Sequence, residues 1–120
     1  MKFKNFNVSV FPSVQGHLQY DALEEYAEKQ DEKTCSAYIP SKAGEQFAIF
    51  VENDGYTDCS VVVYVDGQMA SVLLCYGKPN HNSVVCHGVQ PRPGVLRRFI
   101  FTKAILSGIL PLPPAILYPN

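Results

Sequence analysis

A chain of 120 residues that is 47% hydrophobic fits a single domain that can bury a core of its own. Its 10 basic and 11 acidic side chains nearly cancel, so no overall field draws it to nucleic acid or an anionic membrane. The opening MKFKNFNVSVFPS lacks the apolar run of a signal peptide, which predicts an intracellular protein (cytoplasm or nucleus) with its four cysteines mostly as thiols.

The first predicted strand covers Phe6 to Val10, where apolar and polar side chains alternate, and we expect Pro12 to end it. Two more strands are predicted at 35–39 and 45–52. The second of these is apolar on both faces, which is typical of a central or covered strand. Between them, Pro40 lacks an amide proton and Gly44 permits a tight turn, so we interpret this stretch as two strands joined by a corner.

Residues 20–33, YDALEEYAEKQDEK, are ambiguous. Periodicity alone predicts a helix, because Leu23, Tyr26 and Ala27 share one helical face and Glu25 precedes Lys29 by four positions. The alternative is an outer strand over 23–29, a turn, and a return strand along 34–39.

The clearest local signal is Asp66-Gly67 between two apolar runs, which predicts a hairpin with a two-residue loop. Such a loop pairs Val65 with Gln68, places Tyr64 opposite Met69, and continues with Val63 opposite Ala70 and Val61 opposite Val72.

Further strands are predicted from Ser83 to Val89 and from Arg97 to Phe101, with a loop over 91–94 between them. Elements spaced every 8–12 residues or so are typical of an all-β antiparallel sandwich, of jelly-roll or Ig-like type. We assign residues 1–103 to this sandwich domain and 104–120 to an apolar, Pro-rich tail.

Three blocks taken together resemble a known family: CSAYIPSKAGEQFAIFVEN at 35–53, VVVYVDGQ at 61–68 and RRFIF at 97–101. The chain is similar to an uncharacterised family of fungal intracellular β-domain proteins, a domain of unknown function with C-Y-I-P-S-x-x-G-x-x-F and Y-V-D-G motifs. The resemblance covers residues 6–103 and implies an antiparallel sandwich, with a strand over 23–29. It implies no activity and no catalytic residues, and the chain departs from the family pattern after Lys103.

The side chains that could support catalysis are few. Cys75, His81, Cys86 and His87 are of zinc-ligand type but lack the usual close cysteine pair. Cys86 with His87 is the only thiol and base arrangement, and adjacent strand residues point to opposite faces. We therefore predict no catalytic residues, no metal site and no cofactor. A small thiol- or zinc-dependent enzyme that uses the Cys86–His87 region is an alternative.

Residues 105–120 carry no charge and include four prolines, so they cannot form a membrane-spanning helix of about 20 residues. Left in water, such a tail would aggregate. We expect Ile105–Asn120 to pack on the domain, or else to contact a protein partner or a second copy of the chain.

These observations favour a non-enzymatic intracellular module that interacts with another protein or with a second copy of itself, and they disfavour nucleic acid as a partner. Because the loops at the ends of a sandwich commonly bind ligands, the candidate site is formed by exposed polar or aromatic loop residues. They are Tyr56, Asn80, His81, Asn82 and Arg92. A carbohydrate-binding module is an alternative, because tyrosines on loops can stack on sugar rings.

Overall fold

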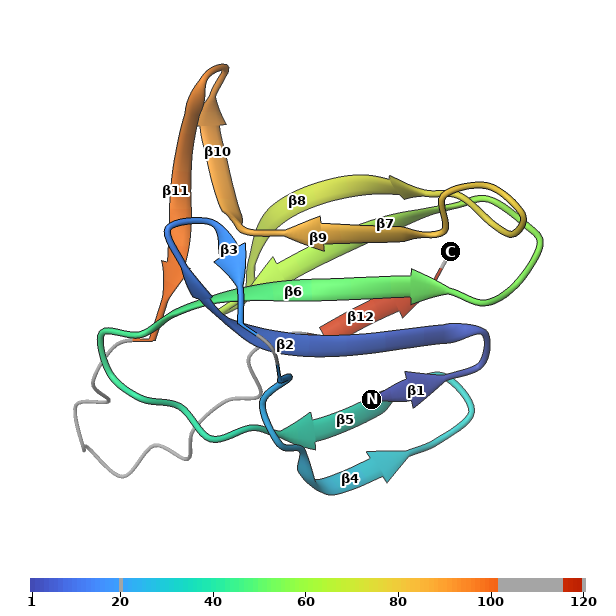
Figure 1. The fold of residues 1–120 in the computed structure, drawn as a ribbon. Coiled ribbons are helices and arrows are strands. Elements are labelled where there is room, and N and C mark those ends of the chain that lie inside the picture. Colours follow the sequence, from blue (N-terminus) through green and yellow to red (C-terminus); the bar gives the residue numbers. More distant parts are fainter. Residues whose placement is uncertain (20, 102–115, 120) are drawn as a thin grey trace.

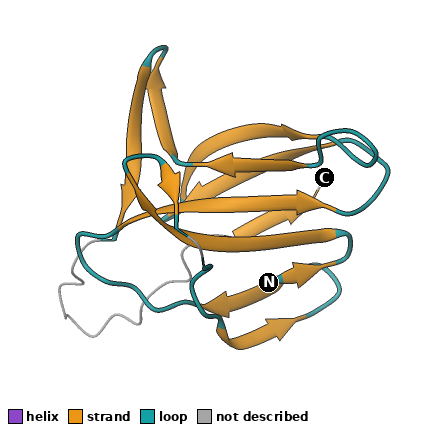
Figure 2. Ribbon diagram, in the orientation of Figure 1, coloured by secondary structure: helices purple, strands orange, loops and turns teal. Residues whose placement is uncertain are grey.

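The computed structural model describes residues 1–19, 21–101 and 116–119, and every regular element in them is a strand (Figures 1 and 2). All strand pairings are antiparallel, which confirms the all-β, antiparallel class. The strands are β1 (Lys2–Phe3), β2 (Phe6–Val14), β3 (His17–Leu18), β4 (Tyr26–Gln30), β5 (Cys35–Tyr38), β6 (Gln46–Asn53), β7 (Cys59–Val65), β8 (Gln68–Cys75), β9 (Ser83–Cys86), β10 (Gly88–Arg92), β11 (Val95–Ile100) and β12 (Ile116–Pro119).

The largest sheet has the order β1-β2-β6-β11-β10, with β3 also pairing with β2 and β9 also pairing with β6. Its centre is the long β2–β6 ladder, which runs from Phe6 opposite Asn53 to Ser13 opposite Gln46. β6 therefore has strands on both sides, as its apolar character on both faces predicts.

β2 does not end at Pro12, as the sequence analysis expected, but continues to Val14. The carbonyl oxygen of Pro12 accepts a hydrogen bond from the amide of Gln19 at 2.9 Å, on the side away from β6. The backbone nitrogen and carbonyl of a strand residue point to the same edge of the strand. The missing N–H of Pro12 therefore removes no hydrogen bond between β2 and β6.

A second sheet has the order β12-β7-β8. The predicted Asp66-Gly67 turn is confirmed, with positive φ at both residues (52° and 75°), and so are the first two pairs beyond it. The predicted register is wrong from Val63 onward. Ala70 is an extra residue in β8, so Val63 lies opposite Ser71 and Val61 opposite Leu73. A β-bulge of this kind adds one residue to one strand. It has no sequence signal as distinctive as the Asp-Gly pair of the turn, so the sequence did not predict it.

The predicted helix over 20–33 is absent from the described part of that segment. The alternative prediction of an outer strand is confirmed, although the strand covers Tyr26–Gln30 rather than 23–29. β4 and β5 form a two-stranded sheet in which the rings of Tyr26 and Tyr38 stack 5.8 Å apart. The carboxylate of Asp31 closes the turn between them by accepting bonds from the amides of Lys33 and Thr34 at 2.8 and 2.7 Å. This Asx-type turn outweighs the helix propensity of the segment.

The corner between the strands at 35–38 and 46–53 is confirmed as a connection between two different sheets. Gly44 has a φ of 84°, which glycine adopts without strain, and its amide donates to the carbonyl of Phe101 at 2.7 Å. The corner is therefore held against the end of β11.

The segment predicted as one strand over 83–89 is two strands, β9 and β10, that separate at His87. β9 pairs with β6, whereas β10 pairs with β11 in a hairpin that projects from the rest of the molecule (Figure 1). The predicted loop over 91–94 is also corrected. Pro91 and Arg92 belong to β10, where a proline is tolerated because β10 is the last strand of its sheet.

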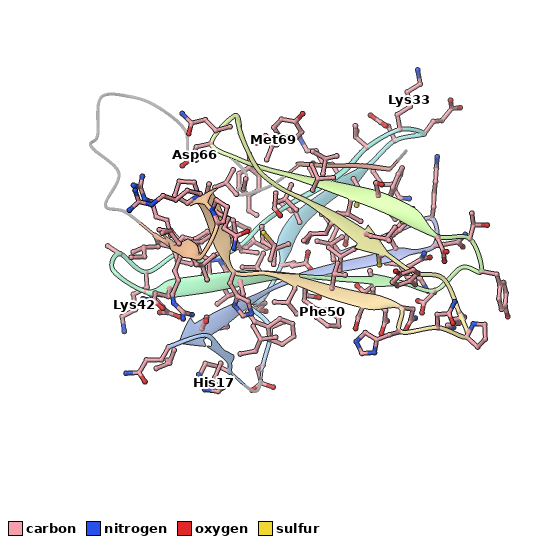
Figure 3. The ribbon with its side chains drawn as sticks, turned by 90° about the horizontal axis from the view of Figure 1, so that it is seen from above. His17, Lys33, Lys42, Phe50, Asp66 and Met69 are labelled. Atoms are coloured by element: carbon pink, nitrogen blue, oxygen red, sulfur yellow. The ribbon has the colours of Figure 1, made fainter. Side chains whose placement is uncertain are left out.

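The core lies between the largest sheet and the β7–β8 hairpin, which Figure 3 shows one above the other. It takes Val8, Val10, Phe47, Ile49, Val51, Cys86 and Phe99 from the former and Val61, Val63 and Cys75 from the latter. The labelled side chains of Phe50 and Met69 lie on opposite outer faces of the molecule (Figure 3).

Of the proposed tail, only the backbone of β12 is described, where Ile116 lies opposite Tyr64 and Pro119 opposite Val61 of β7. The remainder of Ile105–Asn120 lies outside the described residues. Whether the tail packs on the domain or on a partner therefore stays a prediction.

Candidate functional site

The loops after β6 and after β8 lie together at one end of the molecule, on the right in Figure 1. The amide of Lys78 donates to the carbonyl of Gly55 at 2.8 Å, and the amide of Gly77 donates to the carboxylate of Asp58 at 2.9 Å. Gly77 lies so close to the other loop that an added Cβ would be 2.5 Å from the carbonyl carbon of Tyr56. The two loops thus form one fixed unit.

Beneath these loops lies Asn53, which is 1% exposed. Its side-chain nitrogen donates to the carbonyl of Thr57 at 2.9 Å, and its side-chain oxygen accepts from the amide of Gly55 at the same distance. The side chain of Asn82 donates in turn to the carbonyl of Asn53 at 2.8 Å. A buried amide with both ends bonded fixes the path of the loop above it.

Four of the five predicted site residues belong to this loop end. Tyr56 projects into solvent with 83% of its surface exposed, and Asn80 and His81 are exposed as well. Asn82 is half-buried, and its amide group already holds the two loops together. Arg92 lies elsewhere, at the end of β10 on the projecting hairpin (Figure 1), so it cannot contribute to the same site.

Cys86 and His87 have the properties of structural groups. The Cys86 thiol is buried and donates to the carbonyl of Gly88 at 3.6 Å, and burial raises its pKa. Burial and the charge of Arg98 lower the pKa of His87. A cysteine nucleophile needs the opposite shift, toward thiolate. Within the described residues, no three or more His, Cys, Asp or Glu side chains gather to hold a metal ion.

The outer face of β8 is a second candidate surface, which the sequence analysis did not single out. Met69, Val72 and Leu74 alternate along it with 58, 56 and 52% of their surface exposed, and Tyr76 continues the row toward the loop end. We call these four residues the β8 face. Neither β7 nor β8 carries a charged side chain. An antiparallel strand with one buried face usually has polar residues on the other, so this row is unusual.

β8 is also the last strand of its sheet in the described part of the chain. Two other strand edges have protecting features. The two-stranded β4–β5 sheet carries Glu28 and Lys29 and a distorted backbone at Ala27, and the outer edge of β2 bonds to Met1, Gln19 and Leu23. Charges, irregularities and covering segments are the usual means by which edges avoid pairing. The edge of β8 carries the Ala70 bulge, and β9 and β10 lie close to β8 without pairing with it.

Comparisons with protein-family models, with curated proteins and with solved structures find no match to this chain. The resemblance to the fungal β-domain family therefore stays a prediction. The described residues also contain no helix, and hence none long and apolar enough to cross a membrane.

Proposed function

We propose that this protein is a non-enzymatic intracellular interaction module, built as a two-layer β-sandwich, that associates through β8 with a second copy of itself. The uncharged row of Met69, Val72, Leu74 and Tyr76 on a margin strand supports this proposal most directly. The sandwich is supported by the core, to which β2, β6 and β7 each contribute buried side chains.

An antiparallel strand can pair with its own copy around a twofold axis, because residue i then contacts residue j and residue j contacts residue i. β8 suits this arrangement, since a copy of an uncharged strand brings no like charges together. Pairing would join two three-stranded sheets into one and bring the two β8 faces side by side.

The size of the β8 face predicts a weak association. Four side chains that each expose about half of roughly 200 Å² give a patch on the order of 400 Å², as large as the functional patches of many monomers. A stable interface buries about 800 Å² on each partner. We therefore expect a dimer that forms and dissociates with concentration.

The experiment compares the wild-type chain with Val72→Lys and with Val14→Lys by sedimentation over a wide concentration range. Val14 is 57% exposed, almost the same as Val72 at 56%, but lies at the end of β2. We expect the wild type and Val14→Lys to dimerise with rising concentration and Val72→Lys to remain monomeric. A monomeric wild type, or equal effects of the two substitutions, would contradict the proposal.

A second candidate function rests on Tyr56, whose exposed ring is held on a loop fixed by Asn53 and Gly77. An aromatic ring presented rigidly can stack on a sugar, so carbohydrate binding is the alternative that we propose to test. The test is a glycan array with the folded chain and with Tyr56→Ala. Binding that Tyr56→Ala abolishes would support it, and an array without hits would eliminate it.

A further inference from the structure

Cys59 and Cys75 lie directly opposite each other in the last pair of the β7–β8 ladder. Cys75 is fully buried in the core and Cys59 packs against that core, so both side chains lie on the inner side of the hairpin. The Cys59 thiol donates to the carbonyl of Cys75 at 3.6 Å, and each thiol affects the pKa of the other. The other two cysteines have different neighbours: Cys35 contacts Glu28, and Cys86 contacts Gly88.

Directly opposite residues of an antiparallel pair have Cα atoms about 4.5–5.5 Å apart, within the range of about 4.4–6.8 Å that a disulfide requires. Their Cβ atoms, at about 4.5–5.5 Å, are at or beyond the upper end of the disulfide range of about 3.5–4.5 Å. A bond between them can therefore form with a small local adjustment, and it would be strained. Strained disulfides are more easily reduced than structural ones, which makes the bond reversible.

We propose that Cys59 and Cys75 form a reversible cross-strand disulfide, a redox modification that joins β7 to β8 directly beneath the loop end. The reacting groups also touch the residues that hold the loops. The side-chain nitrogen of Asn53 lies 3.8 Å from the Cys59 sulfur, and the Cys75 thiol donates to the carbonyl of Asn82 at 3.5 Å. The modification thus changes the contacts of both loops. It stands independently of the proposed self-association.

The reaction uses a low-molecular-weight disulfide as the oxidant. Cys59, the more accessible partner, loses its proton and attacks one oxidant sulfur, which forms a mixed disulfide and releases the first small thiolate. Cys75 then loses its proton and attacks the Cys59 sulfur, which releases the second small thiolate. Two protein thiols are oxidised to one disulfide, the oxidant is reduced to two thiols, and the two protons pass to the released thiolates.

The environment makes this reaction slow near neutral pH. Burial raises the pKa of both thiols, and the carboxylate of Asp58 raises that of Cys59 further. Since the thiolate is the reacting form, the rate should increase about tenfold for each pH unit until the thiols ionise.

The test treats the folded full chain with oxidised glutathione at mildly alkaline pH and maps the products by mass spectrometry without reduction. We expect the loss of two hydrogens, one link between the peptides that contain Cys59 and Cys75, and shifts in the amide NMR signals of Asn53 and Asn82. A Cys35→Ser/Cys86→Ser variant should behave like the wild type. Cys59→Ser, at the less buried position, should lose the link, and a mild reductant should reverse the reaction in the wild type.

Three results would overturn the proposal. The first is a link that involves Cys35 or Cys86. The second is glutathione retained on Cys59 without closure to Cys75. The third is a folded chain that forms no link under conditions in which the urea-unfolded chain forms one.

Discussion

Asn53 and Asn82 are joined by two hydrogen bonds of 2.8 Å. The Asn53 amide donates to the Asn82 carbonyl, and the Asn82 side chain donates to the Asn53 carbonyl. These residues lie 29 positions apart: Asn53 ends β6, and Asn82 lies in the loop before β9. The geometry of the loop end thus depends on a small polar network rather than on apolar packing.

Asn53→Ala should strongly destabilise the protein. It removes the partners of the Gly55 amide and the Thr57 carbonyl, in a position that is 1% exposed. Leaving such groups unpaired costs about 2–3 kcal/mol in the free energy of unfolding, measured by urea denaturation. Asn80→Ala, on the exposed surface of the same loop end, should change it by less than about 0.5 kcal/mol. Equal effects would show that Asn53 is not a centre of the network.

Gly77→Ala should also be destabilising, because an added Cβ would collide with backbone atoms of Tyr56 and Thr57 at 2.5–2.8 Å. Backbone cannot give way as a side chain can, so we expect a loss of about 1–3 kcal/mol. The matched control is Gly55→Ala, where the nearest atom is the amide nitrogen of the Asn5 side chain at 3.0 Å. In thermal unfolding, Gly77→Ala should have a clearly lower melting temperature than Gly55→Ala. The reverse order would contradict the close packing of Gly77 against Tyr56.

Substitutions of Asp66 test the conformation of the hairpin turn. With a φ of 52°, this position suits asparagine or aspartate but not a β-branched residue. Asp66→Asn should keep the stability of the wild type, and Asp66→Val should lower it by about 1–2 kcal/mol in chemical denaturation. Val65 and Gln68, which close the turn, should lose amide protection in Asp66→Val alone. Unchanged protection in Asp66→Val would mean that the turn is not of this type.

Protonation of His87 should make the protein less stable in mild acid. Burial and the nearby Arg98 charge lower its pKa in the folded state below the ordinary value of about 6.5. Between these two values the unfolded chain binds more protons, so the free energy of unfolding falls as the pH drops below about 6.5. An NMR titration of the imidazole should give the lowered pKa directly, and His87→Gln should flatten the pH dependence in this range. A His87 pKa above 6.5 would reverse the sign and refute the account.

The sequence predicted those features of the structure that depend on neighbouring residues alone. Asp66-Gly67 fixed the hairpin because positive φ at two successive residues is costly for most other pairs. The bulge at Ala70 could not be predicted, because it depends on how β8 twists against its neighbours. Likewise, Pro12 breaks strands in general, and only the strand arrangement shows that its nitrogen faces away from β6.

The sequence predicted the loops of the candidate site but not how they are arranged in space. The loop signals around Tyr56 and His81 are local, but their meeting at one end depends on the β7–β8 hairpin folding back. Arg92 was grouped with them because prolines surround it, although it ends a strand. The β8 face was missed because an alternating apolar row on a strand does not tell which sides of its sheet will be covered.

The most direct test of the central claim is amide hydrogen exchange of the wild-type chain at low and at high protein concentration. If β8 pairs with its own copy, protection at Val72 to Leu74 should rise with concentration, while protection in the central strand β6 stays constant. If protection along β8 is the same at both concentrations, β8 does not mediate self-association and the proposed function is wrong.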